Sequence, residues 1–211
     1  MFLSEIFYSI QGESTYSGLP CVFVRLSGCN LNCPYCDTAY ARDYSLIMNS
    51  EQILATINSF PHTGLVEITG GEPLLQKEVY TLMKVLKKNN FCILLETNGS
   101  LDLKAVPKYV IKIVDIKTPS AGTTSFISSN LQYINPKRDN IKFVISDIND
   151  YEWMKSFLTE FKLRGKHILV STTFQEIKPQ NIVEMIIKDG LDVRFQLQMH
   201  KYIWDPAKRG V

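Results

Sequence analysis

The chain has 211 residues, of which 45% are hydrophobic and 21% charged, proportions typical of a folded globular protein rather than a disordered one. A formal net charge of +2 argues against a strongly basic nucleic-acid-binding protein, so no nucleic-acid partner is expected. A chain of this length can bury its core without disulfide staples, and we expect one domain over residues 1–211.

No secretory signal is visible in the sequence, and none is expected, because Met1-Phe2-Leu3 is followed at once by Ser4 and Glu5. The longest apolar stretches are far shorter than a membrane span, so no membrane partner is expected. These features favour a cytoplasmic protein. Thiols stay reduced in the cytoplasm, so the five cysteines indicate metal binding or chemistry before they indicate disulfides.

Short β-rich runs alternate with helical patterns along the chain. Strands are predicted at Cys21–Ser27, Leu65–Thr69, Phe91–Glu96, Val110–Asp115, Ile141–Ser146, Ile168–Thr172 and Val193–Gln198. Helices are predicted at Glu51–Phe60, Gln76–Asn89, Tyr151–Lys162 and Gln180–Lys188. The alternation indicates the α/β class with a mostly parallel sheet. Between Glu96 and Val110 only a short helix fits.

Several predicted strands carry polar residues on one face. Arg25 shares a face with Cys21 and Phe23, and Glu67 shares a face with Thr69. The last strand places four polar residues on one face: Arg194, Gln196, Gln198 and His200. A sheet covered on both sides is apolar on both faces, so this pattern favours a curved sheet around a wet, ligand-sized interior. The alternative is a set of edge strands that face solvent.

Three of the cysteines, Cys29, Cys33 and Cys36, lie within eight residues in a loop that follows the first predicted strand. Cys21 and Cys92 lie inside apolar strands and are predicted to be small buried hydrophobes. Structural zinc needs four ligands, and no His or Cys follows closely, the nearest being His62. Three thiolates on a four-iron cluster would leave one iron open for another ligand. Zinc with a remote fourth ligand, and ordinary buried thiols, stay as alternatives.

The turn Gly70-Gly71-Glu72-Pro73 follows the strand Leu65–Thr69. Two glycines at a strand end allow a ligand to approach the backbone closely. A turn of this kind can also serve geometry alone. Its occurrence one strand after the cysteine loop makes the combination more specific than either motif.

The cysteine loop and this turn resemble the radical S-adenosylmethionine (SAM) superfamily and, within it, the 7-carboxy-7-deazaguanine synthase family. The resemblance extends from residue 10 to the last residue. It is carried by Ile10–Ser14, Phe23–Cys29, Tyr35–Thr38, Thr69–Pro73, Glu96–Gly99, Gln196–Lys201 and Lys208–Val211.

The resemblance implies a partial, modified (β/α) barrel with a curved, mostly parallel sheet and a cluster loop at 28–38. It implies a 4Fe–4S cluster on Cys29, Cys33 and Cys36, with SAM on the fourth iron. The implied activity is that of a carbon–nitrogen lyase in queuosine or deazapurine biosynthesis. Such a lyase converts 6-carboxy-5,6,7,8-tetrahydropterin into 7-carboxy-7-deazaguanine by a radical ring contraction with loss of ammonia.

The resemblance also implies which residues meet SAM. These are Tyr35, Cys36, Asp37, Gly71, Asp115, Ile116, Lys117, Ser171, Thr172, Thr173 and Phe174. The match is weaker at Asp115–Lys117 and at Ser171–Phe174 than in the cluster loop. A solvated loop is the alternative for Asp115 and Lys117.

Substrate contacts are implied for Ile10, Gln11, Gly12, Arg25, Thr69, Gln198, His200 and Val211. Arginine suits a carboxylate, and the alternative for Arg25 is an internal ion pair with Glu67 or Glu13. A hydrogen-bonded structural histidine is the alternative for His200. Val211 would present a terminal carboxylate to the pterin, and Thr38 would bind Mg²⁺ together with the substrate carboxylate.

The implied partners are an electron donor such as a flavodoxin or ferredoxin and a second copy of the chain in a homodimer. Two other functions remain open from the sequence. One is a different radical SAM activity, such as an activase that makes a glycyl radical on a partner protein. The other is a zinc-binding module without enzymatic activity.

Overall fold

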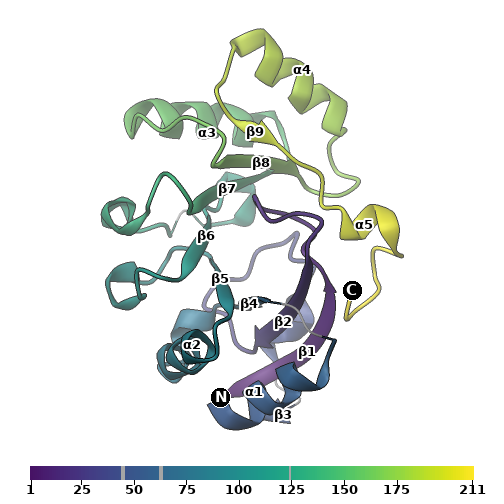
Figure 1. Ribbon diagram of the computed structural model, residues 1–211. Coiled ribbons are helices and arrows are strands. Elements are labelled where there is room, and N and C mark those ends of the chain that lie inside the picture. The colour runs from purple at the N-terminus through teal and green to yellow at the C-terminus, as the bar shows by residue number, and fades with distance from the viewer. Residues whose placement is uncertain (44–45, 62–63, 124) are drawn as a thin grey trace.

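The computed structural model describes residues 1–43, 46–61, 64–123 and 125–211, so His62 lies outside the described residues. Over these residues one sheet has the strand order β3-β1-β2-β4-β5-β6-β7-β8-β9 (Figure 1). The strands are β1 (Phe2–Ile10), β2 (Pro20–Leu26), β3 (Leu46–Ile47), β4 (Leu65–Gly70), β5 (Cys92–Thr97), β6 (Ile111–Asp115), β7 (Asn140–Ile145), β8 (Ile168–Thr172) and β9 (Arg194–Phe195).

Neighbours in the run β2-β4-β5-β6-β7-β8-β9 pair in parallel, and β1 pairs antiparallel with both β2 and β3. The sheet curves between its two edge strands, β3 and β9, without closing (Figure 1). The prediction of an α/β fold with a curved, mostly parallel sheet in a partial barrel is therefore confirmed.

Four helices cover the outside of the curve: α1 (Ser50–Ser59), α2 (Val79–Lys88), α3 (Ile148–Glu160) and α4 (Pro179–Asp189). The short helix α5 (His200–Ile203) and the C-terminal segment lie on the open side (Figure 1). Helix α3 begins three residues before its predicted start because the Asp147 side chain accepts a hydrogen bond from the Asp150 amide at 2.8 Å. Helix α4 ends at Asp189, one residue after the predicted end, and is capped by Gly190, whose φ of 62° is left-handed. No helix in the described chain has the length and apolar character to cross a membrane.

The two faces of the sheet bury different clusters. The outer face packs under the helices through residues such as Val22, Val24 and Ile68. A second, smaller apolar cluster fills the interior near the beginnings of the strands, and it includes Cys21 and Phe23. The polar side chains that the strand pattern predicts for the interior therefore gather at the carboxyl ends of the strands, where side chains of Arg25, Glu67 and Thr69 line a cavity.

The structure corrects several predictions. Strand β1 was not predicted, because polar residues and a register shift between Leu3 and Glu5 interrupt its alternation. The predicted strand Val193–Gln198 is reduced to β9, since the chain leaves the sheet and turns into α5. Cys92 is exposed rather than buried, because it begins β5 at the end of the sheet that lies away from the cavity. The trimmed crossover before β6 is confirmed, with only a 3₁₀ turn at Leu103–Ala105.

Candidate active site at the carboxyl ends of the strands

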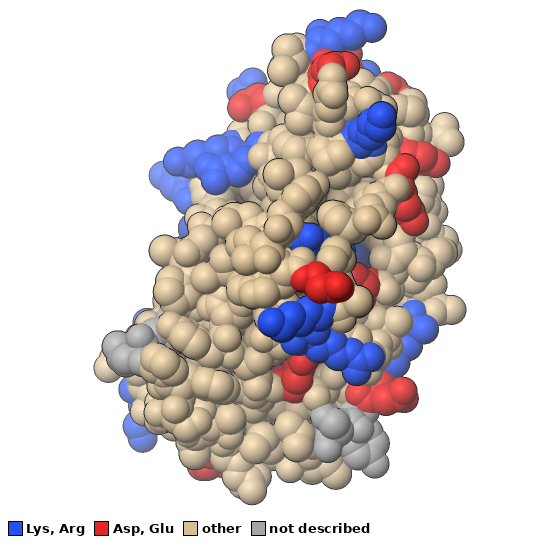
Figure 2. Space-filling model, turned by 90° about the vertical axis from the view of Figure 1, so that its right-hand side faces the viewer, with Lys and Arg blue, Asp and Glu red and all other residues tan. Residues whose placement is uncertain are grey.

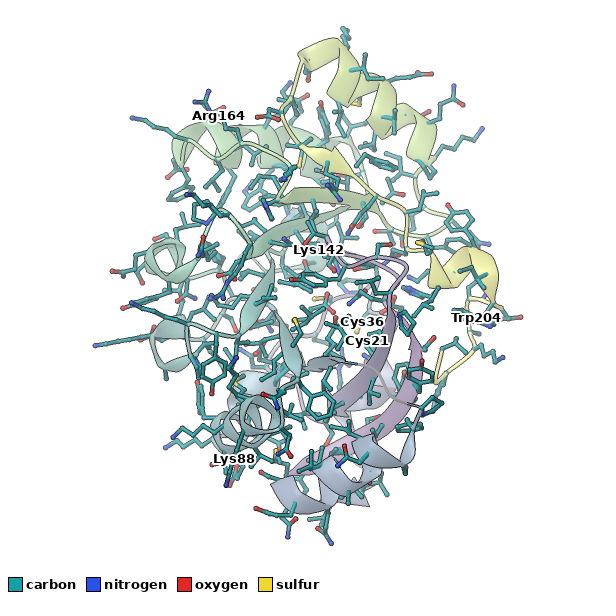
Figure 3. The ribbon with its side chains drawn as sticks, in the orientation of Figure 1. Cys21, Cys36, Lys88, Lys142, Arg164 and Trp204 are labelled. Atoms are coloured by element: carbon teal, nitrogen blue, oxygen red, sulfur yellow. The ribbon has the colours of Figure 1, made fainter. Side chains whose placement is uncertain are left out.

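A cavity of about 420 Å³ opens at the carboxyl ends of the parallel strands. Its walls come from the cysteine loop, the Gly70-Gly71 turn, the ends of β1, β2, β4, β5, β6 and β7, and the C-terminal segment. Figure 2 shows this face, where side chains of both charge signs surround a central hollow. Figure 3 places Lys142 and Cys36 inside the curve of the sheet, whereas Lys88 and Arg164 lie on the outside.

The cysteine loop is closed at its base by backbone contacts. Gly28, with a left-handed φ of 89°, donates its N–H to the Ala41 carbonyl at 2.8 Å. Within the loop, the Cys36 amide bonds the Cys33 carbonyl at 3.2 Å. The thiols of Cys29, Cys33 and Cys36 are all half-buried and line the cavity.

The donor chemistry of this loop fits a cluster held by three thiolates and open toward the cavity. Among the described residues no group of three His, Cys, Asp or Glu side chains is already arranged around a metal position. Three neighbouring thiols on one cavity wall match an open metal centre better than a structural one.

The Gly70-Gly71 turn packs directly against the beginning of the cysteine loop. A side chain at Gly70 would collide with the Leu26 carbonyl, and one at Gly71 with the Gly28 carbonyl and Cys29. Gly70 also has a φ of 148°, which side chains rarely adopt. The glycines are therefore required for the loop and the turn to touch, and Gly71 leaves its backbone open to the cavity.

Glu72 does not face the cavity. Its fully buried carboxylate accepts hydrogen bonds from the amides of Leu74 at 3.0 Å and Asn98 at 2.8 Å, and from the Thr97 hydroxyl at 2.9 Å. Burial nevertheless raises the pKa of Glu72 above its usual range. Its role is to tie the Gly-Gly turn to the end of β5.

Arg25 pairs with Glu5, not with Glu67 or Glu13, the partners considered from the sequence. The Nε atom of Arg25 donates to Glu5 Oε1 at 2.8 Å, and the guanidinium lies 5.7 Å from the Phe7 ring centroid. Within the described chain neither Nη atom of Arg25 makes a hydrogen bond. Two parallel donors on the cavity wall are thus available to a carboxylate.

Lys142 lies at the centre of a charged cluster at the bottom of the cavity. Its ammonium contacts the carboxylates of Glu13, Glu96 at 2.7 Å and Asp115 at 3.7 Å. Gln198 donates to the other oxygen of Glu13 at 2.6 Å. Burial would raise the pKa of Glu13, but the adjacent Lys142 ammonium outweighs it, so this pKa is lowered.

Glu67 has no such cation, and its environment has the opposite effect. Burial and the neighbouring Glu96 carboxylate raise its pKa well above the usual range, and the Gln11 amide donates to its side chain. Burial also lowers the pKa of His200. The bottom of the cavity therefore holds the Lys142 ammonium among three carboxylates, and beside them lie Glu67, whose pKa is raised, and His200, whose pKa is lowered.

Comparison with known proteins agrees with this geometry. The model of the radical SAM superfamily matches residues 23–186. The 7-carboxy-7-deazaguanine synthase of Koribacter versatilis is 41% identical over all of both chains. That of Chlorobaculum tepidum is 42% identical, over 99% of this chain and 96% of its own length. The chain belongs to the 7-carboxy-7-deazaguanine synthase family of the radical SAM superfamily.

The structural comparison concerns the fold. The crystal structure of QueE from Escherichia coli matches 92% of this chain and 93% of its own, with a TM-score of 0.73 and 24% identity. That of Streptococcus suis SuiB bound to the precursor peptide SuiA matches 83% of this chain and 47% of its own, with a TM-score of 0.53 and 16% identity. The fold is therefore the partial barrel of radical SAM enzymes, and the superfamily implies a 4Fe–4S cluster and SAM as cofactors.

The structure brings together most of the residues that the sequence assigned to SAM. Those that line the cavity are Tyr35, Cys36, Asp37, Gly71, Asp115, Lys117 and Thr173. Ile116 lies in the hydrophobic core, and Ser171 is fully buried with a hydroxyl that has no partner in the described chain. Thr172 and Phe174 line a separate hollow of about 360 Å³.

Two of these residues are engaged with lysines. Lys117 pairs with Asp115 at 2.9 Å, and Lys201 pairs with Asp37 at 2.6 Å. Asp115 keeps one buried oxygen without a hydrogen-bond partner in the described chain, so it retains an acceptor for a ligand. The alternative of a solvated loop does not describe Asp115, because it is buried.

All of the residues assigned to the substrate line the cavity: Ile10, Gln11, Gly12, Arg25, Thr69, Gln198, His200 and Val211. Thr38 also lines it, and its hydroxyl lies 3.8 Å from the Cys36 thiol. Sequence reasoning missed Lys142 as a site residue. The available signal was a lysine inside an apolar strand, on the face that alternation assigns to the interior.

Proposed function

We propose that this chain is a 7-carboxy-7-deazaguanine synthase that acts in queuosine or deazapurine biosynthesis. In this reaction 6-carboxy-5,6,7,8-tetrahydropterin contracts its ring and loses ammonia. The observation that carries the proposal is that one cavity joins the three loop thiols to the two free donors of Arg25. The full-length similarity to enzymes of that name supports it.

Within this proposal Cys29, Cys33 and Cys36 hold the cluster, and the cavity-lining residues of the loop, the Gly-Gly turn and β6 hold SAM. The chemistry that a bound 4Fe–4S cluster with SAM supplies is one-electron cleavage of the sulfonium and hydrogen abstraction from the substrate. The chain itself contributes position and charge. The proposal treats residues 1–211 as a single radical SAM domain, with the cluster loop at residues 28–38.

The residues around the pterin have distinct tasks in this proposal. Arg25 binds the substrate carboxylate with its two Nη atoms, because that planar fork matches a carboxylate. The amide of Gln11 and the hydroxyl of Thr69 line the cavity beside Glu67 and Glu96, to which they are hydrogen-bonded. The charged cluster at Lys142 gives the pterin a fixed polar surface.

Several further elements belong to the same proposal. Thr38 is the protein ligand of a Mg²⁺ ion shared with the substrate carboxylate, since Mg²⁺ takes oxygen ligands and few protein contacts. A flavodoxin or ferredoxin in the cytoplasm supplies the electron. A homodimer is supported by the exposed edge strand β3, whose side chains Leu46 and Ile47 are 42% and 65% exposed. Sedimentation of wild type and Ile47→Asp tests that surface.

The test of the function is anoxic reconstitution with iron and sulfide, followed by SAM, a reductant and the carboxytetrahydropterin. The expected result is a product with the mass of 7-carboxy-7-deazaguanine and one ammonia per turnover. A reconstituted, SAM-cleaving protein that leaves the pterin unchanged would overturn the substrate assignment and favour another radical SAM activity. Stoichiometric zinc without iron in anaerobically purified protein would remove the enzymatic proposal.

Arg25→Lys sharpens the test, because lysine keeps the charge and loses the paired donors. Hydrogen bonds to charged groups contribute about 1.5–3 kcal/mol, so KM for the pterin should rise about 10-fold to 100-fold, with a smaller effect on kcat. The matched control is Arg194→Lys on β9, an arginine outside the cavity lining. Equal KM values for the two variants would show that Arg25 does not bind the substrate.

A further inference from the structure

The last residues of the chain form one wall of the cavity. We call residues 206–211 the C-terminal strap; all six line the cavity, opposite the sheet. Within the described chain, residues 209–211 make no hydrogen bond or ion pair with any other segment. A contact that does attach the strap is the Arg209 guanidinium, which lies 4.0 Å from the centroid of the Tyr40 ring.

Tyr40 follows the cluster loop in the chain. It lies in the 3₁₀ turn Ala39–Arg42, directly after the loop. Its neighbour Ala41 is fully buried, donates to the Thr38 carbonyl at 2.8 Å and accepts from the Gly28 amide at 2.8 Å. The backbone beside Tyr40 is therefore hydrogen-bonded to both ends of the cluster loop.

The hydroxyl of Tyr40 reaches the arginine expected to hold the substrate. It donates to Glu5 Oε1 at 2.7 Å, and the same oxygen accepts from Arg25 Nε at 2.8 Å. Burial raises the pKa of Tyr40 to about 12, so the hydroxyl keeps its proton and stays a donor. Glu5 and Arg25 are direct neighbours in the β1–β2 pairing, so little slack separates them.

We propose that Tyr40 is a positioning residue that couples closure of the C-terminal strap to the orientation of Arg25. The ring holds the strap through Arg209, and the hydroxyl holds Glu5, which in turn directs the Nη atoms of Arg25 into the cavity. The role of Arg25 in this coupling rests on the proposed function. Coupling between two sites is reciprocal. A carboxylate bound to Arg25 should therefore shift the strap toward its closed position by the same factor by which closure raises the affinity of Arg25 for the carboxylate.

The test measures the strap and the arginine separately, on the full chain. The strap is followed by limited trypsin cleavage after Lys208, read as the loss of residues 209–211 by mass spectrometry. The arginine is followed by the Kd for 6-carboxypterin, a probe with the substrate carboxylate that needs no turnover. Thermal unfolding confirms that each variant is folded.

Two variants separate the two contacts of Tyr40, that of its ring with Arg209 and that of its hydroxyl with Glu5. Tyr40→Phe keeps the ring, so cleavage of the ligand-free protein should match wild type, while 6-carboxypterin binds about 10-fold more weakly. Tyr40→Leu removes both contacts, so cleavage should also rise about 2-fold to 5-fold, the range expected from an exposed cation–π contact. Arg209→Gln should accelerate cleavage to the same extent and tests the strap contact without altering the tyrosine.

The decisive readout is protection of the strap by 6-carboxypterin. It should slow cleavage of wild type, and this protection should be lost in Tyr40→Phe. The matched control is Tyr109→Leu, where a ring lies 5.7 Å from Lys87 Nζ outside the cavity lining, and it should change neither quantity.

Unchanged protection in Tyr40→Phe, or wild-type cleavage of ligand-free Tyr40→Leu and Arg209→Gln, would overturn the proposal. A wild-type protein that binds no 6-carboxypterin would contradict the proposed function instead. In that case phenylglyoxal modification of Arg25 reads its orientation, and an equal rate in wild type and Tyr40→Phe would refute the coupling.

Discussion

Replacing Lys142 by methionine tests the electrostatics of the cavity most directly. Methionine keeps an unbranched side chain of similar reach and removes only the ammonium. That ammonium is the charge around which Glu13, Glu96 and Asp115 are arranged, and the Lys142 side chain is only 6% exposed. The variant would leave Glu13 buried and ionised without a cation.

Removal of one partner from a buried ion pair costs about 3–5 kcal/mol of unfolding free energy. For a chain of this size the loss corresponds to a Tm about 6–20 °C lower. The loss should depend on pH. In wild type the lowered pKa of Glu13 stabilises the fold above its ordinary value of 4.5, and this stability disappears as the pH falls through the lowered pKa.

In the variant burial acts on Glu13 without Lys142, so the pKa of Glu13 rises above 4.5 and the carboxyl takes up a proton as the pH falls. Protonation removes the buried charge, so the difference from wild type should narrow between pH 8 and pH 5. Lys142 itself does not titrate between pH 8 and pH 5. Burial would lower its pKa, but Glu13 and the other carboxylates outweigh burial and raise that pKa above 10.5.

The assay is thermal unfolding of the metal-free protein at pH 8, 6.5 and 5. The control is Lys155→Met on α3. Lys155 forms surface ion pairs with Asp189 at 2.6 Å and Glu152 at 3.2 Å, and these should contribute little to the free energy of unfolding. A Lys142→Met protein as stable as wild type at pH 8, or a difference that widens toward pH 5, would refute the reasoning.

Three further predictions follow from other parts of the structure. Gly71→Ala should lower the iron bound per chain after reconstitution because its side chain displaces the cluster loop, whereas Gly64→Ala, where the added carbon meets no atom within 4 Å, should not. In the native protein the exposed Cys92 should react with iodoacetamide, and faster as the pH rises past 9, because partial burial of its thiol raises the pKa above the ordinary 9.0. The buried Cys21 should not react, and peptide mapping that shows the opposite order would contradict the assigned exposure. NMR titration should give His200 a pKa below 6.5, since burial disfavours its charged form. The free energy of unfolding should therefore decrease as the pH falls below 6.5, because the unfolded chain binds this proton more readily. A pKa above 6.5 would show instead that the acidic neighbours of the imidazole keep it charged.

The sequence alone was sufficient to predict the features that depend on neighbouring residues. Apolar alternation identified the strands from β4 to β8 within about two residues. The spacing of Cys29, Cys33 and Cys36 placed three candidate ligands in one loop, and the alternation of β2 and β4 placed Arg25 and Glu67 on an interior face that lines the cavity. These signals are local, since side-chain direction in a strand follows from period two.

The tertiary structure decided every partnership between distant residues. Lys142 meets Glu13 across 129 positions and Glu96 across 46, and strand order and register determine which of them can touch. The register of β1 and β2 also places Glu5 opposite Arg25, so Arg25 pairs with Glu5 rather than with the carboxylates considered from the sequence. The placement of β5 decided the exposure of Cys92, because this residue begins the strand at the end of the sheet that lies away from the cavity. Local pattern determines where a side chain points, but the assembled sheet determines what it meets there.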